Sequence, residues 1–321
     1  VQVTDSNGCM ASDSLIYNTS LVLVPQITIT PIPGICNGTG TIALAPHFSP
    51  AGGVFSGVGV TGQTFDPALA GGVGTYIVYY NYTDTSSGCS NMDSTTIQVI
   101  SCCNIVSGIN TADQDRSSTY GISFNNNSPV PVAINGAFYV DNNFMLNGFS
   151  GANHIRLAPD AKIVIRQNCR LTANSCLFQR CDSAMWESII IEPGGELVLN
   201  GCQVRDAKAA VTSLGGAKYT INTTDLFRNY IGIKVEPASG IHPGTIVSSN
   251  IVGAVLGYPP YAGVRSRYGI QLTLVDSIVI GVAGSLTNEN TIRDVEVGLY
   301  ALTSKVGLVR NRFLTITQPS M

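Results

Sequence analysis

Short apolar runs, separated by turns rich in Gly, Pro, Asn and Asp, make up most of this chain of 321 residues. In residues 25–100 the runs are enriched in Thr, Val, Ile and Tyr and recur at intervals of about 8–15 residues, a pattern typical of an antiparallel β-sandwich. The runs are QITITP, TIALAP, GGVFSG, TYIVYYNYT and STTIQVI. No apolar run reaches the length of about 18 residues that suggests a membrane helix, so the sequence predicts an all-β protein with no membrane span.

From residue 133 onward, shorter apolar triplets recur at a fixed interval. Three matches share the same offset: 163–165 with 189–191, Leu171 with Leu197, and Cys176 with Cys202. A period of about 26 residues, with three short strands per repeat, indicates a right-handed parallel β-helix. Each turn cannot bury its own apolar residues, but stacked turns share one continuous core.

A second motif joins an apolar residue, Arg, and then Asp or Asn. It occurs at 204–206, 227–229, 292–294 and 309–311. The first step between these motifs, from Val204 to Phe227, is slightly shorter than the offset of the triplets. A small residue follows the first three motifs, at Ala210, Gly232 and Gly298. Asp and Asn tolerate left-handed backbone in turns, so we interpret their repetition as structural rather than catalytic.

Charge divides the chain sharply. Residues 1–115 contain seven Asp and no Lys or Arg, whereas the remainder contains all 17 basic residues and 13 acidic ones. This asymmetry indicates two modules that join near residues 101–103. The whole chain has a net charge of −3 and a pI of about 5.6, which gives no electrostatic basis for binding nucleic acid.

The nine cysteines are an odd number, so at least one has no partner within the chain, and Cys9 is the expected orphan. Cys36 precedes the second strand of the sandwich and Cys89 follows its longest strand. We predict a disulfide between them, because closing such a loop is worth about 4 kcal/mol in a small module.

In the β-helix, Cys176 and Cys202 lie on adjacent turns, where they form either a disulfide or a ladder of thiols. Cys169 and Cys181 flank one strand and are the other candidate pair. The chain has no C-x-x-C motif and its three His are scattered, so we expect no metal site and no cofactor.

The run GGVFSGVGVTGQTFDPALAGGVGTYIVYYNYTDTSSGC resembles the immunoglobulin-like repeats of large secreted proteins of Bacteroidota. These repeats carry G-x-F-S-G, F-D-P, G-x-Y-x-I/V-x-Y and S-G-C in the same order. The opening VQVTDSNGC is similar to the closing strands of repeats in the gliding-type adhesins of that group. The stretch MWESIIIEPGGELVLNGCQVRDAKAAV resembles their β-helical regions, except that Glu187-Ser188 stands where the family often has Gly.

Together, pattern and resemblance predict four segments of an all-β chain. Residues 1–24 are the C-terminal hairpin of a preceding β-sandwich repeat, 25–101 an immunoglobulin-like β-sandwich, 102–132 a linker or β-helix cap, and 133–321 a right-handed parallel β-helix that continues further. We therefore expect a fragment of a longer polypeptide. The resemblance implies an exported protein, delivered by type IX secretion to the outer cell surface or beyond.

The same resemblance implies O-glycosylation at Asp-Ser-apolar triplets, which places candidate sites at Ser14, Ser183 and Ser277. The N-x-S/T sequons, such as those at Asn18, Asn37, Asn81 and Asn222, are interpreted as coincidence.

The segment 253–269 is the longest break in the repeat and concentrates aromatic rings and guanidinium groups. They are Tyr258, Tyr261, Arg265, Arg267 and Tyr268. Such a set suits a sugar or an acidic polymer. The alternative is a loop that packs its own tyrosines over the flank of the β-helix, and we favour this packing interpretation.

Many β-helices degrade polysaccharides, a reaction that needs two carboxylates about 5–9.5 Å apart. The adjacent Asp-Asp, Gly-His-Gly and Arg-x-Lys patterns of polygalacturonase-like enzymes are missing. We therefore expect a non-enzymatic extracellular adhesive or structural protein whose partner is a glycan or a cell-surface or matrix ligand. The alternatives are a homo-oligomeric subunit of an extracellular fibre or sheath, and a β-helical polysaccharide lyase or hydrolase.

Overall fold

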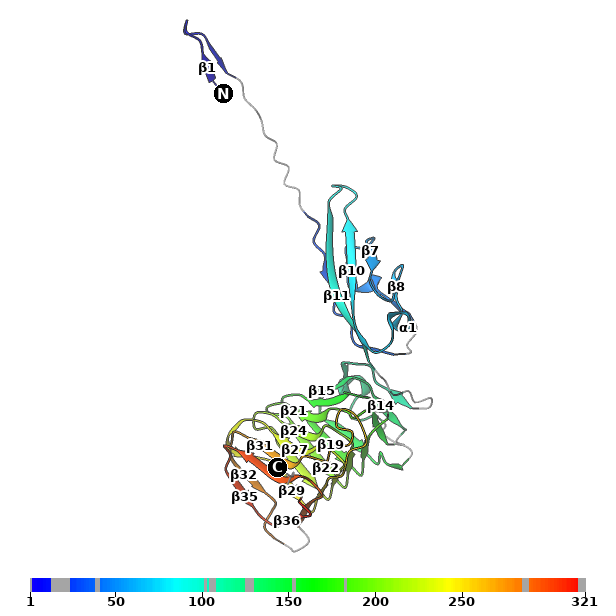
Figure 1. The fold of residues 1–321 in the computed structure, drawn as a ribbon, viewed down its shortest axis with the longest axis vertical. Coiled ribbons are helices and arrows are strands. Elements are labelled where there is room, and N and C mark those ends of the chain that lie inside the picture. Colours follow the sequence, from blue (N-terminus) through cyan, green and yellow to red (C-terminus); the bar gives the residue numbers. More distant parts are fainter. Residues whose placement is uncertain are drawn as a thin grey trace.

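The computed structural model describes residues 2–12, 24–37, 41–100, 103, 108–124, 130–151, 154–181, 184–284 and 289–316. These residues are almost entirely β-structure (Figure 1). The helices in them are short: α1 (Pro67–Ala70) and the 3-10 turns η1 (Ala45–His47) and η2 (Ser117–Tyr120). Near the N-terminus, β1 (Gln2–Thr4) and β2 (Met10–Ser12) form a two-stranded antiparallel hairpin. None of the helices described here has the length and apolar character needed to cross a membrane.

Residues 24–100, without 38–40, form the N-terminal β module, which has three small sheets. The four-stranded sheet contains β4 (Ile35–Cys36), β11 (Ser90–Ile100), β10 (Gly74–Thr83) and β7 (Val54–Ser56) in that order. The other two contain β5 (Ile42–Ala43), β9 (Thr64–Phe65) and β8 (Val60–Thr61), and β3 (Thr28–Ile29) with β6 (Phe48–Ser49). Alternate residues of β10, such as Val78 and Tyr80, point into a separate apolar core.

The predicted Cys36–Cys89 disulfide is wrong, because Cys89 is a free cysteine. β10 and β11 form a long antiparallel hairpin of ten residue pairs. Cys36 pairs with Ile100 at one end of this hairpin, whereas Cys89 lies in the turn at the other end. Ten residues of strand span roughly 30 Å, far more than the distance of about 6 Å that a disulfide bridges between Cα atoms.

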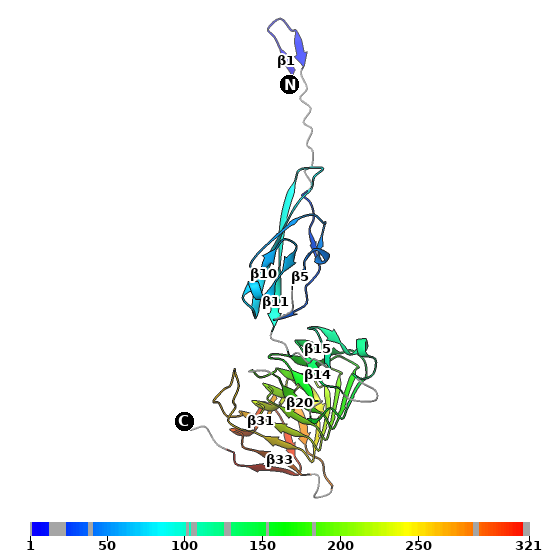
Figure 2. The same cartoon turned by 90° about the vertical axis from the view of Figure 1, so that its right-hand side faces the viewer.

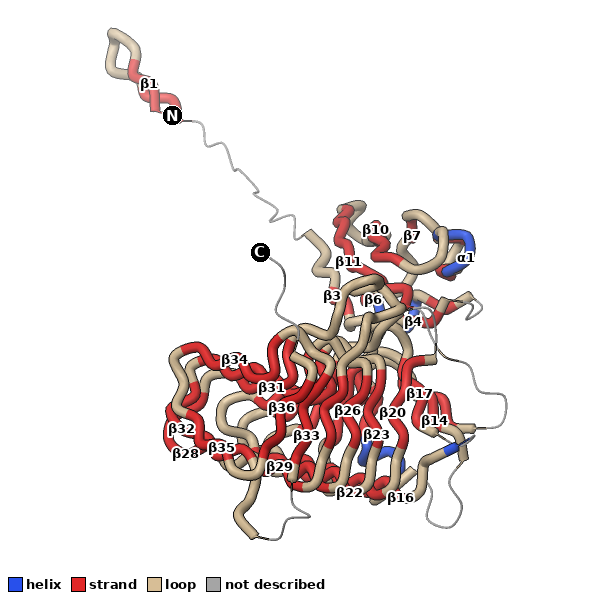
Figure 3. Tube along the Cα trace, turned by 60° about the horizontal axis from the view of Figure 1, so that its bottom comes forward, coloured by secondary structure: helices blue, strands red, loops and turns tan. Residues whose placement is uncertain are grey.

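The rest of the chain forms a β-solenoid of about eight turns with purely parallel sheets. The nine-stranded sheet contains β12 (Ile109–Asn110), β14 (Val132–Ile134), β17 (Ile155–Leu157), β20 (Leu177–Arg180), β23 (Gln203–Arg205), β26 (Asp225–Phe227), β30 (Asn250–Val252), β33 (Asn290–Arg293) and β36 (Asn311–Leu314). Figure 3 shows these strands side by side from β14 to β36.

Three further sheets complete the turns. The eight-stranded sheet contains β13 (Asp115–Arg116), β15 (Ala137–Val140), β18 (Lys162–Ile165), β21 (Ser188–Ile191), β24 (Ala209–Ser213), β27 (Ile231–Val235), β31 (Tyr268–Thr273) and β34 (Val297–Leu302). The five-stranded sheet contains β16 (Phe144–Asn147), β19 (Arg170–Asn174), β22 (Glu196–Asn200), β25 (Lys218–Asn222) and β29 (Thr245–Val247). The three-stranded sheet contains β28 (Ala238–His242), β32 (Val275–Ile280) and β35 (Val306–Leu308).

The predicted repeat is confirmed by the pairing of strands. Residues 163–165 pair with 189–191, and Leu171 pairs with Leu197. The solenoid begins earlier than the predicted residue 133, because β12 and β13 already pair with β14 and β15. Residues of the expected linker therefore supply its first turn. The N-terminal β module lies at this end of the solenoid, beside β14 and β15 (Figure 2).

The Arg-containing motif follows the turns less regularly than predicted. The strand pairing takes Val204 to Leu226 rather than to Phe227, so the motif is out of register by a single position. Asp206 and Arg228 consequently occupy the same corner, both with left-handed backbone (φ 59° and 55°). The motif at 309–311 spans the corner between β35 and β36, and Asn311 is the first residue of β36, whereas the other three motifs lie at the end of a strand of the nine-stranded sheet. The left-handed conformation thus belongs to a position in the turn, and Arg occupies it as well as Asp.

The predicted small residues do share one place in successive turns. Ala210, Gly232, Gly269 and Gly298 follow one another on β24, β27, β31 and β34. A Cβ atom on Gly232 would lie 2.4 Å from the carbonyl oxygen of Gly269, and one on Gly269 would lie 2.5 Å from that of Gly298. The backbones therefore approach too closely for any larger side chain at these glycines.

The interior of the solenoid is one continuous apolar core that extends from Cys103 to Val295. Its first turn is closed by a cluster of four aromatic rings: Tyr120, Phe124, Phe138 and Phe144. The neighbouring rings in this cluster have centroids 5.0 to 6.3 Å apart. Edge-on and tilted contacts of this kind add to the hydrophobic burial at the first turn.

A ladder of buried polar side chains runs along the corner that precedes the nine-stranded sheet. The amide of Cys176 donates to Sγ of Cys202 (3.5 Å), and the amide of Cys202 donates to Oγ1 of Thr224 (3.2 Å). The amide of Thr224 donates to Oγ of Ser249 (3.1 Å), whose own amide donates to Oδ1 of Asn290 (3.0 Å). Cys176 and Cys202 are both free. Of the two predicted arrangements, the structure has the ladder of thiols.

A disulfide joins Cys103 to Cys181, so the predicted pair of Cys169 and Cys181 is wrong. Cys169 is free. Cys181 follows β20 of the nine-stranded sheet, whereas Cys169 precedes β19 of the five-stranded sheet, at a different corner of the solenoid. The spacing of the two cysteines in the sequence does not reveal this, because β19, a corner and β20 lie between them and carry the chain from one sheet to another.

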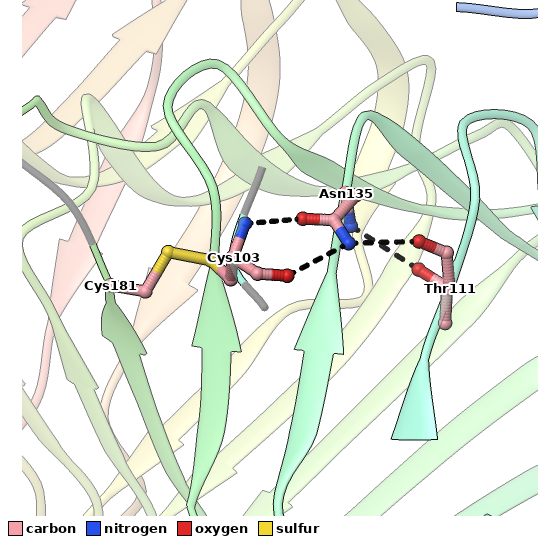
Figure 4. Close-up of a disulfide and its surroundings, with 4 residues drawn as sticks. All are labelled: Cys103, Thr111, Asn135 and Cys181. Carbon is pink, nitrogen blue, oxygen red and sulfur yellow. Dashed lines mark hydrogen bonds between the residues drawn. A yellow bond between two sulfur atoms is a disulfide. The ribbon is translucent and has the colours of Figure 1, made fainter. Parts of the chain in front are cut away.

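The backbone of Cys103 is also held by a buried amide (Figure 4). Its N–H donates to Oδ1 of Asn135 (2.7 Å), and Nδ2 of Asn135 donates to the carbonyl oxygens of Cys103 (3.3 Å) and Thr111 (3.0 Å). The disulfide and Asn135 together attach the chain before β12 to the neighbouring turns.

Candidate functional site

The tyrosines of the loop at 253–269 pack against the solenoid itself. The guanidinium of Arg180 lies 3.1 Å above the centroid of the Tyr258 ring. The ring of Tyr261 stacks on that of Tyr230, with centroids 3.6 Å apart and planes inclined by 9°. These contacts bear out the packing interpretation of the loop, because each ring is covered by a partner within the chain.

The other three predicted binding residues also have partners within the chain. Arg267 forms an ion pair with Glu296 (2.8 Å), and Arg265 donates to the carbonyl oxygen of Asp294 (3.4 Å). Tyr268 begins β31, and its ring lies beside that of Tyr300. The guanidinium of Arg267 also lies 5.5 Å from the centroid of the Tyr268 ring, and the amides of both residues donate to the carbonyl oxygen of Tyr230. The structure therefore groups Tyr261, Arg267 and Tyr268 around Tyr230, whereas Tyr258 and Arg265 have other partners.

The predicted glycosylation sites are only partly described. Ser14 and Ser183 lie outside the described residues. Ser277 lies in β32, half-buried, next to Asp276, whose carboxylate accepts the amide of Gly240 (2.9 Å). Ser277 is thus at the rim of an open hollow, which Lys305 also lines.

A groove of about 460 Å³ runs over the outer face of the nine-stranded sheet. Side chains alternate along its strands, so that Val204, Leu226 and Ile251 point into the core and are buried. The next residue on each strand points outward. The outward residues that line the groove include Arg205, Phe227, Val252, Arg293, Asp225 and Asn250.

The groove combines an aromatic ring with charged and amide groups. The guanidinium carbons of Arg205 and Arg228 lie 5.7 and 5.0 Å from the centroid of the Phe227 ring. Asn250 donates to the carboxylate of Asp225 (2.8 Å). Rings flanked by guanidinium groups, with amides beside them, are suited to hold the apolar face and the hydroxyls of a sugar.

A buried charge cluster supports one side of this groove. Asp206 has a side-chain exposure of only 2%, and Arg228 holds both of its carboxylate oxygens at 3.1 Å. Arg180 approaches to 3.9 Å. Burial raises the pKa of Asp206 even though these arginines oppose the shift. This carboxyl group is enclosed by its own ion pairs and is therefore placed to support the groove rather than to react.

A second hollow, of about 640 Å³, lies where the N-terminal β module meets the eight-stranded sheet. Among the residues that line it, Nζ of Lys208 bonds to carboxylate oxygens of Asp160 (2.6 Å) and Glu187 (2.8 Å). Burial lowers the pKa of Lys208, but these two hydrogen bonds outweigh burial and raise it. Asp113 accepts the amides of Gly34 (3.2 Å) and Ala137 (2.7 Å) and so joins the two modules.

Within the described ranges, no three His, Cys, Asp or Glu side chains gather in a way that would hold a metal ion. The groove was not predicted from the sequence, because Arg205 and Arg293 were interpreted there only as parts of a turn motif. The available signal was the alternation on each strand, which places these arginines outward whenever the preceding apolar residue points inward.

The fold and the groove define a β-solenoid protein with an arginine-lined outer face. Comparison of the chain with known protein families, curated proteins and solved structures gave no match.

Proposed function

We propose that this chain is a non-enzymatic extracellular protein with an adhesive and structural role. In this proposal the N-terminal β module is an immunoglobulin-like spacer, and the solenoid is a right-handed β-helix that displays its outer faces. The observation that carries the proposal is the single continuous core of the solenoid, which makes it one stiff body. The Cys103–Cys181 disulfide supports an extracellular location, because such bonds persist in oxidising compartments.

The sequence motifs support a more specific origin. On the resemblance of residues 52–89 and 185–211 to repeats of Bacteroidota surface proteins, we infer delivery by type IX secretion. A glycan or a matrix component is then the natural partner, since the groove combines apolar side chains, among them the Phe227 ring, with arginines and neutral polar groups.

We propose the absence of a catalytic role from the ion pairs that the carboxylates in and beside the two hollows make. Asp160 and Glu187 share one Lys208 ammonium, and Asp206 is enclosed by arginines. A glycosidase needs one carboxylic acid and one carboxylate that both face the sugar. Neither arrangement supplies such a pair.

The proposal is tested by incubating the whole chain with a panel of plant, algal and bacterial polysaccharides. We expect retention on polysaccharide-coated beads without release of reducing ends or unsaturated products. Time-dependent product release that is abolished by Glu187→Gln would instead establish a polysaccharide-degrading enzyme. Negative-stain electron microscopy of the same sample should show single elongated particles. Regular fibres would favour the fibre or sheath alternative.

A further inference from the structure

The arginines and lysines of the solenoid are segregated between its faces. Seven of the twelve arginines lie in the strands of the nine-stranded sheet or directly beside them: Arg156, Arg180, Arg205, Arg228, Arg293, Arg310 and Arg312. All five lysines lie elsewhere: Lys162, Lys208, Lys218, Lys234 and Lys305. A planar guanidinium binds carboxylate and sulfate groups through two parallel hydrogen bonds, which an ammonium group does not. The face of the nine-stranded sheet therefore carries the groups that bind carboxylate or sulfate through two hydrogen bonds.

Several of these arginines have no ion-pair partner among the described residues, although the charge of Arg205 also acts on the buried carboxylate of Asp206. Arg180 and Arg228 hold Asp206, and Arg293 holds Asp294. By contrast, no carboxylate of the described chain lies within ion-pair distance of Arg156, Arg205 or Arg312. Among the described residues, the Arg205 guanidinium donates to the side-chain oxygen of Gln203 (2.6 Å) and lies near the Phe227 ring. The face thus carries positive charge that an external anion can neutralise.

The register arranges the outward side chains in two columns along the solenoid axis. One column contains Arg205, Phe227, Val252, Arg293 and Leu314, and continues from Gln179 and Arg156. The other contains Gln203, Asp225, Asn250, Thr291 and Arg312. Successive positions in a column are about 4.8 Å apart, so Arg205 lies roughly 10 Å from Arg156 and roughly 15 Å from Arg293 in the first column. Arg312, in the second column, lies four strands beyond Arg205, or roughly 20 Å along the axis.

This spacing suits a linear ligand whose negative charges also recur. We propose that the outer face of the nine-stranded sheet binds an acidic polysaccharide along the solenoid axis. Its carboxylate or sulfate groups pair with Arg156, Arg205 and Arg312, and Phe227 packs against a sugar ring. Asn250 and neighbouring polar groups bond to hydroxyls. The inference rests on the proposed adhesive function and assigns its ligand class.

Charge distinguishes this ligand from a nucleic acid. A duplex is held by many phosphate contacts on a strongly basic surface. This chain has a net charge of −3, and Asp225 lies within the groove. A flexible chain of sugars, with charges separated by hydroxyls, is complementary to such a mixed surface.

The test measures binding of the full chain to four immobilised polymers by biolayer interferometry. They are polygalacturonate (carboxylated), dextran sulfate (sulfated), dextran (neutral) and duplex DNA. We expect binding to one or both acidic polysaccharides that weakens with salt, and little binding to dextran or DNA. The two acidic polymers distinguish carboxylate from sulfate as the recognised group.

The decisive variant carries Arg156→Gln, Arg205→Gln and Arg312→Gln. We expect its affinity to fall roughly tenfold or more, since a charge-assisted hydrogen bond is worth about 1.5–3 kcal/mol. The matched control carries Lys162→Gln, Lys218→Gln and Lys234→Gln, which removes the same charge from other faces and should retain binding. Replacing the three arginines with lysine keeps the charge and should lose most of the affinity. Phe227→Ala is a second, independent variant that keeps every charge and should also weaken binding.

Equal losses in the arginine and lysine variants, or equal binding of dextran or DNA, would overturn the assignment. Circular dichroism of each variant identifies any that fails to fold, and Phe227→Ala then decides alone. If the chain binds neutral glycans on beads but neither acidic polymer, the ligand class is wrong while the adhesive function survives. If it degrades the polymers, the adhesive function itself fails.

Discussion

Removing the Cys103–Cys181 disulfide should weaken the solenoid mainly at its first turn. The bond closes a loop with a sequence separation of 78 residues. On the chain-entropy model, a loop of this size stabilises the folded state by about 4.5 kcal/mol. β12 and β13 contribute only two residues each, so the first turn has few other strand contacts to hold it in place.

The variant Cys103→Ala/Cys181→Ala avoids placing an unpaired hydroxyl in a buried position. Its thermal unfolding midpoint should fall by roughly 10–15 °C, since 1 kcal/mol corresponds to about 2–4 °C in a module of this size. Circular dichroism measures the midpoint. Hydrogen exchange with mass spectrometry should show the greatest loss of protection in residues 108–124, beside the lost bond, and much less in residues 184–252.

Cys9→Ala is the matched control, because Cys9 is exposed and free and lies in the N-terminal hairpin. Its midpoint should equal that of the parent. The reasoning is refuted if the double variant melts within about 2 °C of the parent. It is also refuted if protection is lost evenly along the solenoid, because the bond would then not act through the first turn.

Three further perturbations test other parts of the structure. Gly232→Ala should lower the free energy of unfolding by about 1–3 kcal/mol, because its Cβ would clash with a carbonyl oxygen 2.4 Å away. Chemical denaturation measures this change. Gly257→Ala is the control: its Cβ would meet nothing within 4 Å, so its free energy of unfolding should equal that of the parent. Burial lowers the pKa of His242, so the unfolded chain takes up its proton first, and stability should fall as the pH drops below about 6.5. His242→Gln should lose that part of the pH dependence between pH 7.5 and 5.5, and an identical slope in both proteins would contradict this. Asp113→Ala removes the acceptor for the amide of Gly34, which links the two modules. Small-angle scattering should therefore show a looser arrangement of the modules. An unchanged scattering profile would mean that other contacts are enough to hold the modules together.

Local patterns predicted the class of fold because they report on burial within one turn. The triplets at 163–165 and 189–191 recur at the repeat length, and they pair as expected. The pattern failed where turn lengths change. The number of residues from Ile251 to its partner Ile292 is almost twice the number from Ile292 to its partner Phe313. Sequence similarity between turns therefore no longer gives the strand register.

The candidate site was less predictable than the fold. Tyr258 and Tyr261 were correctly expected to pack on the flank of the solenoid, yet their partners Arg180 and Tyr230 come from distant turns. The groove around Phe227 depends on several strands that are consecutive in space but separated in the chain by connections of unequal length.

The sequence by itself determined an all-β chain with a repeating second part, because alternation of apolar and polar side chains and the chemistry of turns are local properties. It also determined where charge is concentrated. Only the tertiary structure decided that Cys103 bonds to Cys181, that Cys36 and Cys89 lie at opposite ends of a hairpin, and that Arg205 and Phe227 share one column. Each of these depends on how far the chain travels between turns, and irregular turn lengths leave that distance to packing rather than to spacing.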